Sequence, residues 1–250
     1  MAESAISVKD VKIRYRCFKK VSLLKAIFAP KKFSKTEYFE AVKGVSFEVE
    51  KGQILGIVGK NGSGKSTLFS ILAGINLADG GEFTVDGIDL LKKPDGKVLG
   101  YIPQTPPLLE ELSAADNLSL WYSKRDMKKS LEDGVLKRLG VDKFLRTTVS
   151  KMSGGMIKRL SIGCSVAGDP KIILLDEPSA ALDLVAKAEI IDYLVSFKNS
   201  GGTVLLATHD ANELDFCDVL YIIQDGRLVK YDYDGDIARL ADALAGDSAK

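Results

Sequence analysis

The stretch ILGIVGKNGSGKSTLFSILAG, residues 54–74, decides the fold. Its first five residues form an apolar run, which is typical of a strand buried on both faces of a parallel sheet. A glycine-rich turn follows, and the run STLFSILAG then has the character of a helix. A strand that passes through such a turn into a helix is the context of a phosphate-binding loop. A glycine-rich turn that matches by chance is the alternative, and the flanking strand and helix disfavour it.

The loop itself fits the pattern G-x-x-x-x-G-K-[ST] over residues 59–66. Glycines let backbone N–H groups turn inward around phosphate oxygens, and the helix N-terminus adds positive potential. We expect Lys65 to reach the β- and γ-phosphates of a nucleotide and Ser66 to bind Mg²⁺. The nucleotide-binding residues predicted here are Gly59, Asn61, Gly62, Ser63, Gly64, Lys65, Ser66 and Thr67.

Two adjacent carboxylates end a second apolar run, KIILL, residues 171–175. Asp176 is predicted to hold Mg²⁺ through water. Glu177 is predicted to act as the general base or to position the attacking water. Adjacent carboxylates are also common as ordinary surface caps, so the assignment depends on the phosphate loop elsewhere in the chain.

Two further polar residues follow expected strands. His209 is the only histidine, and it lies after TVLLAT, at the edge where open α/β sheets bind ligands. A neutral imidazole there can donate to a γ-phosphate or orient a water molecule. Gln104 follows VLGYI and is predicted to sense the Mg²⁺ ion or the water. A lone histidine is otherwise more often structural, and a lone glutamine would be unremarkable.

The bulk composition agrees with one α/β unit. The chain has 250 residues, of which 46% are hydrophobic, enough for a sizeable core. The 35 Lys and Arg nearly cancel the 34 Asp and Glu, so no specific nucleic-acid partner is indicated. The three cysteines are widely spaced and form no zinc or disulfide pattern. No apolar run reaches the roughly 20 residues that span a bilayer. We therefore expect a cytosolic chain, which would work at a membrane only as a peripheral subunit on its cytoplasmic face.

The chain resembles the ATP-binding cassette (ABC) ATPases in six motifs that occur in the family's order. They are GKNGSGKST, YIPQ, MSGGM, IILLDEP, SAALD and the TH of ATHD. Other P-loop families share only the first and the fourth, and the NKxD motif of a GTPase is absent. The resemblance implies ATP and Mg²⁺ as cofactors. It also implies ATP hydrolysis that drives export through separate transmembrane permease subunits.

The resemblance also implies the architecture. We expect a RecA-like P-loop α/β core with an antiparallel β part and an inserted helical subdomain, all within one nucleotide-binding domain over residues 1–250. The expected core comprises residues 1–103 and 166–232. The expected helical subdomain covers residues 104–165 and carries the signature, and residues 233–250 form a tail with a short helix. Helical patterns run over residues 66–73, 127–139 and 186–197.

A second phosphate-binding pattern, Ser153-Gly154-Gly155, gains a role from the family. There two nucleotide-binding subunits pack head to tail, and each ATP lies between the phosphate loop of one subunit and the signature of the other. The three residues are thus expected to bind the γ-phosphate of a partner's ATP. Asp183, in the SAALD loop, is expected to couple the two sites. Taken alone, the pattern is a helix cap and Asp183 a helix-start acid. The full motif set suits a homodimer, and a heterodimer stays open.

The signature departs from the family's usual LSGGQ, because Met152 and Met156 replace Leu and Gln. The serine and both glycines remain. We expect slower or retuned hydrolysis rather than an inactive site.

Adenine is usually held in this family by an aromatic residue near the end of the first strand. Tyr15 fits best. Tyr38 or Phe39 are alternatives, because a long segment separates Tyr15 from VSFEV. Each aromatic residue could equally belong to the core.

That long segment is basic. It has nine Lys and Arg and no Asp or Glu from Lys12 to Lys35. Residues 17–38 are predicted to be a basic amphipathic insertion that contacts anionic lipid. A solvated loop is the alternative. Cassette ATPases that export polysaccharides or teichoic acids have a similar extension, so such cargo is one expectation, and other lipid-linked or peptide cargo is another.

Two other classes of function stay open. A soluble cassette ATPase could act on nucleic acid or ribosomes, although the coiled-coil insertion of DNA-repair members and the second cassette of translation factors are missing. A P-loop kinase or regulator is opposed by the signature and the acid pair. For the transporter, residues 104–112 (QTPPLLEEL) are the expected contact for a cytoplasmic helix of the permease.

Overall fold

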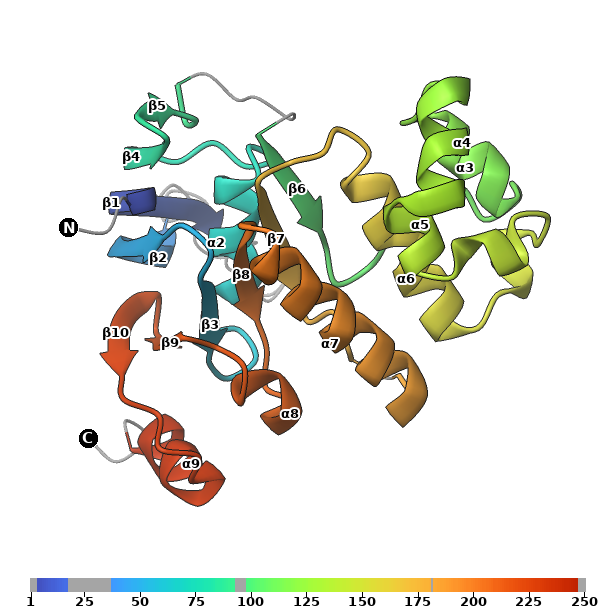
Figure 1. Cartoon of the computed structure of the whole chain (residues 1–250). Coiled ribbons are helices and arrows are strands. Elements are labelled where there is room, and N and C mark those ends of the chain that lie inside the picture. The colour runs from blue at the N-terminus through green and yellow to red at the C-terminus, as the bar shows by residue number, and fades with distance from the viewer. Residues whose placement is uncertain (1–3, 18–36, 93–97, 181, 247–250) are drawn as a thin grey trace, which may run out of the picture.

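The computed structural model describes residues 4–17, 37–92, 98–180 and 182–246. Two sheets form one part of the molecule, and a group of short helices lies to one side of them (Figure 1). This arrangement is the mixed α/β fold with an antiparallel sheet and helical part that the sequence predicts.

The larger sheet has the order β10-β9-β3-β8-β7-β6. The strands from β9 to β6 are parallel to their neighbours, and β10 is antiparallel at the edge. Every residue of β3, β7 and β8 is buried, as their continuous apolar runs predict. The bounds are β3 (Ile54–Val58), β6 (Leu99–Ile102), β7 (Ile172–Asp176), β8 (Thr203–Ala207), β9 (Val219–Gln224) and β10 (Arg227–Tyr231).

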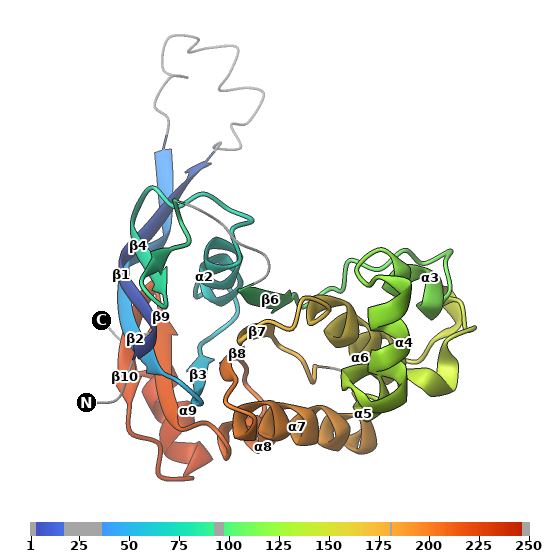
Figure 2. The ribbon, with the colours of Figure 1, turned by 45° about the horizontal axis from the view of Figure 1, so that its top comes forward.

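The smaller sheet is antiparallel, with the order β2-β1-β4-β5. It contains β1 (Ser4–Cys17), β2 (Glu37–Glu50), β4 (Gly80–Val85) and β5 (Ile88–Asp89). The sequence run VSFEV is only the last part of β2, because pairing with β1 extends the strand as far as the Cys17–Glu37 pair. The β1–β2 ribbon therefore projects beyond the other strands of its sheet (Figure 2). The predicted insertion at 17–38 falls mostly outside the described residues, and Cys17, Glu37 and Tyr38 belong to strands.

One helix packs between the sheets, and another covers the outer face of the larger one. Helix α2 (Lys65–Leu72) buries Leu68 and Phe69 in a core shared with both sheets. Helix α7 (Leu184–Asn199) buries Ile190 and Leu194 against the other face. Short α8 (Ala211–Leu214) precedes β9, and α9 (Ile237–Ala245) is the helix predicted in the tail.

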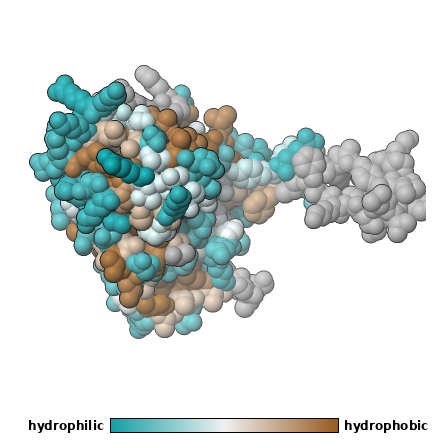
Figure 3. Space-filling view, turned by 90° about the vertical axis from the view of Figure 1, so that its right-hand side faces the viewer, coloured by the Kyte–Doolittle hydropathy of each residue, from teal (hydrophilic) through white to brown (hydrophobic). Residues whose placement is uncertain are grey.

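The helical group has its own part of the core, where Leu118, Leu136 and Leu160 are fully buried. It contains α3 (Ala114–Ser119), α4 (Lys124–Asp133), α5 (Val135–Arg138), α6 (Gly154–Ser165) and two 3₁₀ turns, η2 (Val141–Phe144) and η3 (Val149–Lys151). Figure 3 views the molecule from this side and shows hydrophobic areas among hydrophilic ones. Leu109, Leu120 and Trp121 are among the exposed apolar side chains.

The helical pattern predicted over residues 127–139 is confirmed, but it consists of two helices, α4 and α5. Gly134 is extended, with φ −109° and ψ −157°, and it separates α4 from α5. The backbone N–H of Leu136 donates to the Ser130 hydroxyl at 3.2 Å, which stabilises the break. Within the described ranges, no helix is long and apolar enough to cross a bilayer.

Candidate nucleotide site

The phosphate loop connects β3 to α2, and its backbone contacts the side chain of Lys65. The ammonium of Lys65 donates to the carbonyl of Gly59 at 2.6 Å and lies 3.8 Å from Oε1 of Glu177. Burial lowers the pKa of Lys65, and the two acidic neighbours, Glu177 and Asp176, oppose that shift. Gly64 has φ +111°, and a Cβ there would lie 2.6 Å from the carbonyl oxygen of Ala41. The motif therefore needs glycine at 64 for both backbone conformation and space.

A cavity of about 500 Å³ opens over this loop. It brings together residues from six separate parts of the sequence, and most of the predicted nucleotide residues line it. The lining consists of Tyr15, Phe39, Ala41, Lys60, Asn61, Gly62, Gly64, Lys65, Ser66, Thr67, Gln104, Glu177 and His209. Gly59 and Ser63 lie within the loop but do not line the cavity.

Asp176 is the last residue of β7 and is only 2% exposed. The Ser66 hydroxyl hydrogen-bonds its carboxylate. Burial raises the pKa of Asp176, and the Ser66 bond and the lysines Lys65 and Lys158 offset part of that shift. Among the described residues, its Oδ1 atom has no hydrogen-bond partner. A buried carboxylate oxygen without a partner beside a hydroxyl group fits Mg²⁺, which prefers oxygen ligands.

Glu177 follows at once, in an uncommon backbone conformation with φ +49°. Its backbone N–H donates to Ala207 at 2.8 Å, which holds it at the end of β8. The Gln104 amide donates to Oε2 at 3.0 Å, and Nδ1 of His209 lies 3.3 Å from Oε1. Left-handed conformations of residues other than glycine cluster at functional sites. The loops after β6, β7 and β8 thus meet where ligands bind parallel sheets.

A residue that the sequence did not indicate supports this arrangement. Glu213, in α8, is 1% exposed and accepts a hydrogen bond from the Thr208 hydroxyl. Thr208 in turn accepts from the backbone N–H of Asp210 at 2.9 Å, so the loop that carries His209 is tied to α8. Burial raises the pKa of Glu213. A glutamate in a short amphipathic segment gives no sequence signal of burial.

The second phosphate-binding pattern lies in a different cavity, of about 660 Å³. Ser153 caps α6 and accepts from the Met156 N–H at 3.3 Å. Asp183 caps α7 and accepts from the Ala186 N–H at 2.8 Å. Both lie at this cavity, with Leu184 80% exposed beside them. Within one chain the phosphate loop and the signature are therefore not brought together.

The structure separates the three aromatic candidates for adenine. Tyr15 and Phe39 are cross-strand partners in β1 and β2, and both line the cavity over the phosphate loop. The Tyr15 hydroxyl accepts from the Asn76 side chain at 3.2 Å. Tyr38 is 62% exposed, outside the cavity, with the guanidinium carbon of Arg14 5.8 Å from its ring centroid. The pairing of Phe39 with Tyr15 depends on strand register and was not visible in the sequence.

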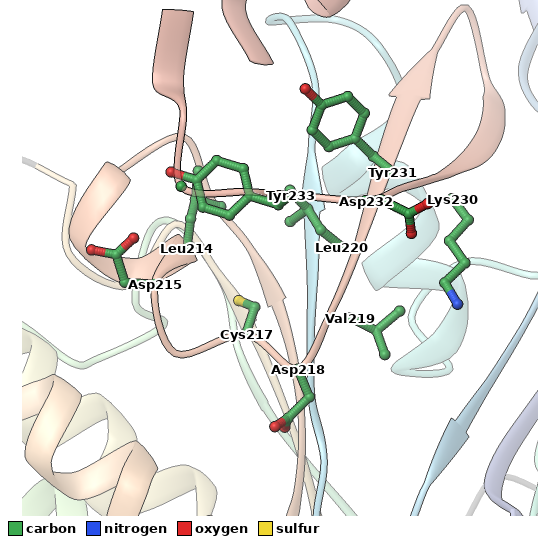
Figure 4. A pocket seen from close by; sticks show the side chains of 11 residues that line it. Leu214, Asp215, Cys217, Asp218, Val219, Leu220, Lys230, Tyr231, Asp232 and Tyr233 are labelled. Atoms are coloured by element: carbon green, nitrogen blue, oxygen red, sulfur yellow. The ribbon is translucent and has the colours of Figure 1, made fainter. Parts of the chain in front are cut away.

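Another cavity, of about 400 Å³, lies between α8, β9 and the chain that follows β10 (Figure 4). The carboxylate of Asp218, which lines this cavity, accepts hydrogen bonds from the Ile54 N–H at 2.7 Å and from the Lys198 ammonium at 2.5 Å. That carboxylate ties β9 to β3 and α7, and we assign it a structural role.

The fold and site together define a P-loop ATPase of the cassette class. The described parts combine a phosphate loop, an acid pair at a strand end and a helical group that carries a second phosphate-binding pattern. The chain belongs to the ABC transporter family, whose sequence profile, described as "ABC transporter", matches residues 42–180. The predicted family and its ATPase class are thereby confirmed.

Curated relatives agree with this assignment. The chain is 31% identical over 216 residues to the "Linearmycin resistance ATP-binding protein LnrL" of Bacillus subtilis (strain 168), covering 83% of this chain and 68% of the relative. It is 32% identical over 215 residues to the "Probable multidrug ABC transporter ATP-binding protein YbhF" of Escherichia coli (strain K12), covering 83% of this chain. The match spans only 36% of that relative's length.

Solved structures agree in fold. A nucleotide-free ATP-binding cassette from an ABC transporter superposes with a TM-score of 0.77 at 24% identity, covering 98% of each chain. The cassette MJ0796, described as a dimeric post-hydrolysis state bound to ADP and Pi, superposes with a TM-score of 0.74 at 26% identity. That match covers 91% of this chain and 99% of the other. The predicted RecA-like cassette fold is confirmed.

Proposed function

We propose that the chain is the ATP-hydrolysing subunit of a membrane exporter and that two copies close around two ATP molecules. The observation that carries the proposal is the contact of Glu177 with Gln104 and His209, beside Lys65 of the phosphate loop. A carboxylate, an amide, an imidazole and an ammonium group therefore lie at the edge of one cavity. Such an arrangement can activate a water molecule next to a bound phosphate.

The reaction follows from these positions. The loop N–H groups and Lys65 hold the β- and γ-phosphates of ATP. Asp176, Ser66 and Gln104 would hold Mg²⁺, which neutralises developing phosphate charge when bound. Glu177 accepts a proton from water while His209 and Gln104 orient it. The water oxygen bonds to the γ-phosphorus, the bond to the β–γ bridging oxygen breaks, and ADP and phosphate leave.

The second half of each site comes from the partner copy. Ser153, Gly154 and Gly155 lie at the N-terminus of the 12-residue helix α6, where the helix dipole favours a phosphate. Asp183 lies at the same cavity and would couple the two sites. ATP binds the closed dimer better than the open one, and this difference drives closure. The complete motif set supports a homodimer.

Export and a permease partner are supported by the relatives. Their names include multidrug and lantibiotic transport and linearmycin resistance, in Escherichia coli, Streptococcus pyogenes and Bacillus subtilis. We propose separate transmembrane permease subunits that contact residues 104–112, where Leu109 is half-exposed. The subunit would then sit peripherally on the cytoplasmic face of the membrane. Antibiotic-like peptide cargo agrees best with these names, and lipid-linked cargo such as a polysaccharide or teichoic acid is the second candidate.

One part of the proposal, and the alternative to it, rest on sequence alone. Contact of residues 17–38 with anionic lipid is proposed from their basic composition. The soluble alternative, action on nucleic acid or ribosomes, has no structural observation in its favour, and near-neutral charge argues against a specific nucleic-acid partner.

The variant Glu177→Gln tests the proposal. The substitution removes the carboxylate base and keeps the size of the side chain. We therefore expect ATP hydrolysis to fall at least about 100-fold while ATP still binds. The trapped ATP should then hold a stable dimer, measured by size exclusion with light scattering. Glu132→Gln, on exposed α4, is the matched control and should behave as wild type. A Glu177→Gln protein that stays monomeric with ATP and hydrolyses it normally would contradict the proposal.

A further inference from the structure

A buried lysine in the helical group has no part in the proposed reaction. Lys158 lies in the second turn of α6, and only 5% of it is exposed. Its ammonium donates to the carbonyl of Pro103 at 3.4 Å, and it has no ion-pair partner among the described residues. Burying an ammonium without a paired carboxylate is costly, so the position calls for a physical reason.

The surroundings of Lys158 are acidic. Burial lowers its pKa, and three carboxylates oppose that shift, those of Asp176, Glu213 and Glu177. The interaction is mutual, because Lys158 is among the groups that lower the pKa of Asp176. The charge of Lys158 therefore acts on the electrostatics of the proposed catalytic acid pair.

The contact with Pro103 leads directly to the same pair. Pro103 precedes Gln104, whose amide donates to Glu177 at 3.0 Å. Helix α6 holds this segment at a second point, because the Ser165 hydroxyl donates to the carbonyl of Tyr101 at 2.9 Å. Helix α6 therefore hydrogen-bonds the chain on both sides of Ile102, directly before Gln104.

We propose that Lys158 is a positioning residue that transmits the position of α6 to Gln104 and, through it, to Glu177. The inference rests on the proposed function, because it needs Ser153 to hold a partner's ATP at the start of the same helix. Ser153 serves one composite site and Glu177 of the same chain serves the other. A helix fixed at Ser153 by ATP would place Gln104 correctly in the opposite site. The two sites would then be coupled through one rigid helix and one buried contact.

Lys158→Met tests this in the full-length protein with Mg²⁺ and ATP. Methionine has a similar volume without the charge, so the melting temperature should stay unchanged or rise. We expect kcat to fall about tenfold and the Hill coefficient for ATP to fall from about 2 toward about 1, because the sites lose their coupling. Nucleotide affinity of the monomer should change less than about twofold, because Lys158 does not line the cavity. Lys158→Arg keeps the charge and donors and should restore at least half of the lost kcat.

A double-mutant comparison separates positioning from a merely structural role. If Lys158 acts through Gln104, then Lys158→Met should change kcat less than about twofold in a Gln104→Ala background. Lys128→Met, on an ammonium that is 77% exposed in α4, is the matched control and should have no effect. A folded Lys158→Met protein with wild-type kcat and Hill coefficient would overturn the proposal, as would an undiminished effect in the Gln104→Ala background.

A second variant and a second background complete the test. Should Lys158→Met fail to fold, Lys158→Gln, whose amide is too short to reach Pro103, is judged by the same criteria. In a Glu177→Gln background, Lys158→Met should still form the ATP-dependent dimer. If Glu177→Gln alone forms no dimer, the proposed function fails. If only the double variant fails, Lys158 is needed for dimer closure itself and the positioning proposal is overturned.

Discussion

The two phosphate-binding patterns of this chain differ in how much of a site each one contains. The phosphate loop has a lysine that is 5% exposed and an acid pair beside it, all from one chain. At the signature, Ser153 and Gly154 are exposed, and the Ser153 hydroxyl is already used to cap α6. A site that binds its ligand alone holds its charges in place before binding. The exposure of Ser153 and Gly154 agrees with the proposal that the signature completes its site only with a partner copy.

The largest predicted effect separates the two patterns. Lys65→Ala should weaken ATP binding to the monomer at least about 100-fold, because it removes the buried cation that faces the phosphates. Ser153→Asp keeps a capping side chain and adds a negative charge where a partner's γ-phosphate would lie. It should leave monomer binding within about twofold and lower hydrolysis at least about 100-fold. Titration with a fluorescent ATP analogue and a steady-state ATPase assay measure the two quantities. If Ser153→Asp also weakened ATP binding to the monomer, the signature would belong to the chain's own site, and the difference between the two patterns would not hold.

The next effect concerns adenine. Tyr15→Ala should weaken ATP binding about tenfold, since stacking a base on an aromatic ring contributes roughly 1–3 kcal/mol. Tyr38→Ala is the matched control, because its ring lies outside the cavity, and its affinity should stay near wild type. Comparing ATP with tripolyphosphate isolates the base: only ATP affinity should depend on Tyr15. An equal loss for both ligands would point to Tyr15 as a structural residue.

A smaller effect is expected at Met156. This side chain is half-buried and packs against the core of the helical group. Met156→Gln returns a polar group near the partner's nucleotide, and kcat should rise about threefold, the scale of one weak hydrogen bond. Monomer ATP affinity should not change, because the residue is distant from the chain's own phosphate loop. A fall in kcat would mean that the packing of methionine matters more than the polar contact.

The smallest predicted effect is a pH dependence of stability from Glu213. Burial raises its pKa above the ordinary value of 4.5. Below that value the carboxyl is protonated in both folded and unfolded states, and it carries no ionisation penalty. As pH rises through the folded pKa the buried charge destabilises the fold. Glu213→Gln should therefore melt about 3 °C higher than wild type at about pH 8, with the difference vanishing near pH 4. A difference in melting temperature that is independent of pH would contradict this.

Much of the fold was predictable because local rules decide it. The apolar runs around Ile54, Ile172 and Val204 are continuous, and this pattern identifies strands buried on both faces. The break at Gly134 was missed, because a helical pattern tolerates an isolated glycine and the pattern alone does not show where a helix is interrupted. The full length of β2 was missed as well, because a strand continues as far as its partner allows, and the partner is distant in sequence.

The sequence by itself determined the family, the nucleotide chemistry and the order of the motifs. A phosphate loop needs particular residues at particular spacing, and that requirement is written locally. Only the tertiary structure decided which residues meet. It pairs Phe39 with Tyr15, buries Lys158 and Glu213 near the acid pair, and separates the signature from the phosphate loop. These contacts join segments far apart in the chain, so strand register and packing set them, and no short stretch of sequence contains them.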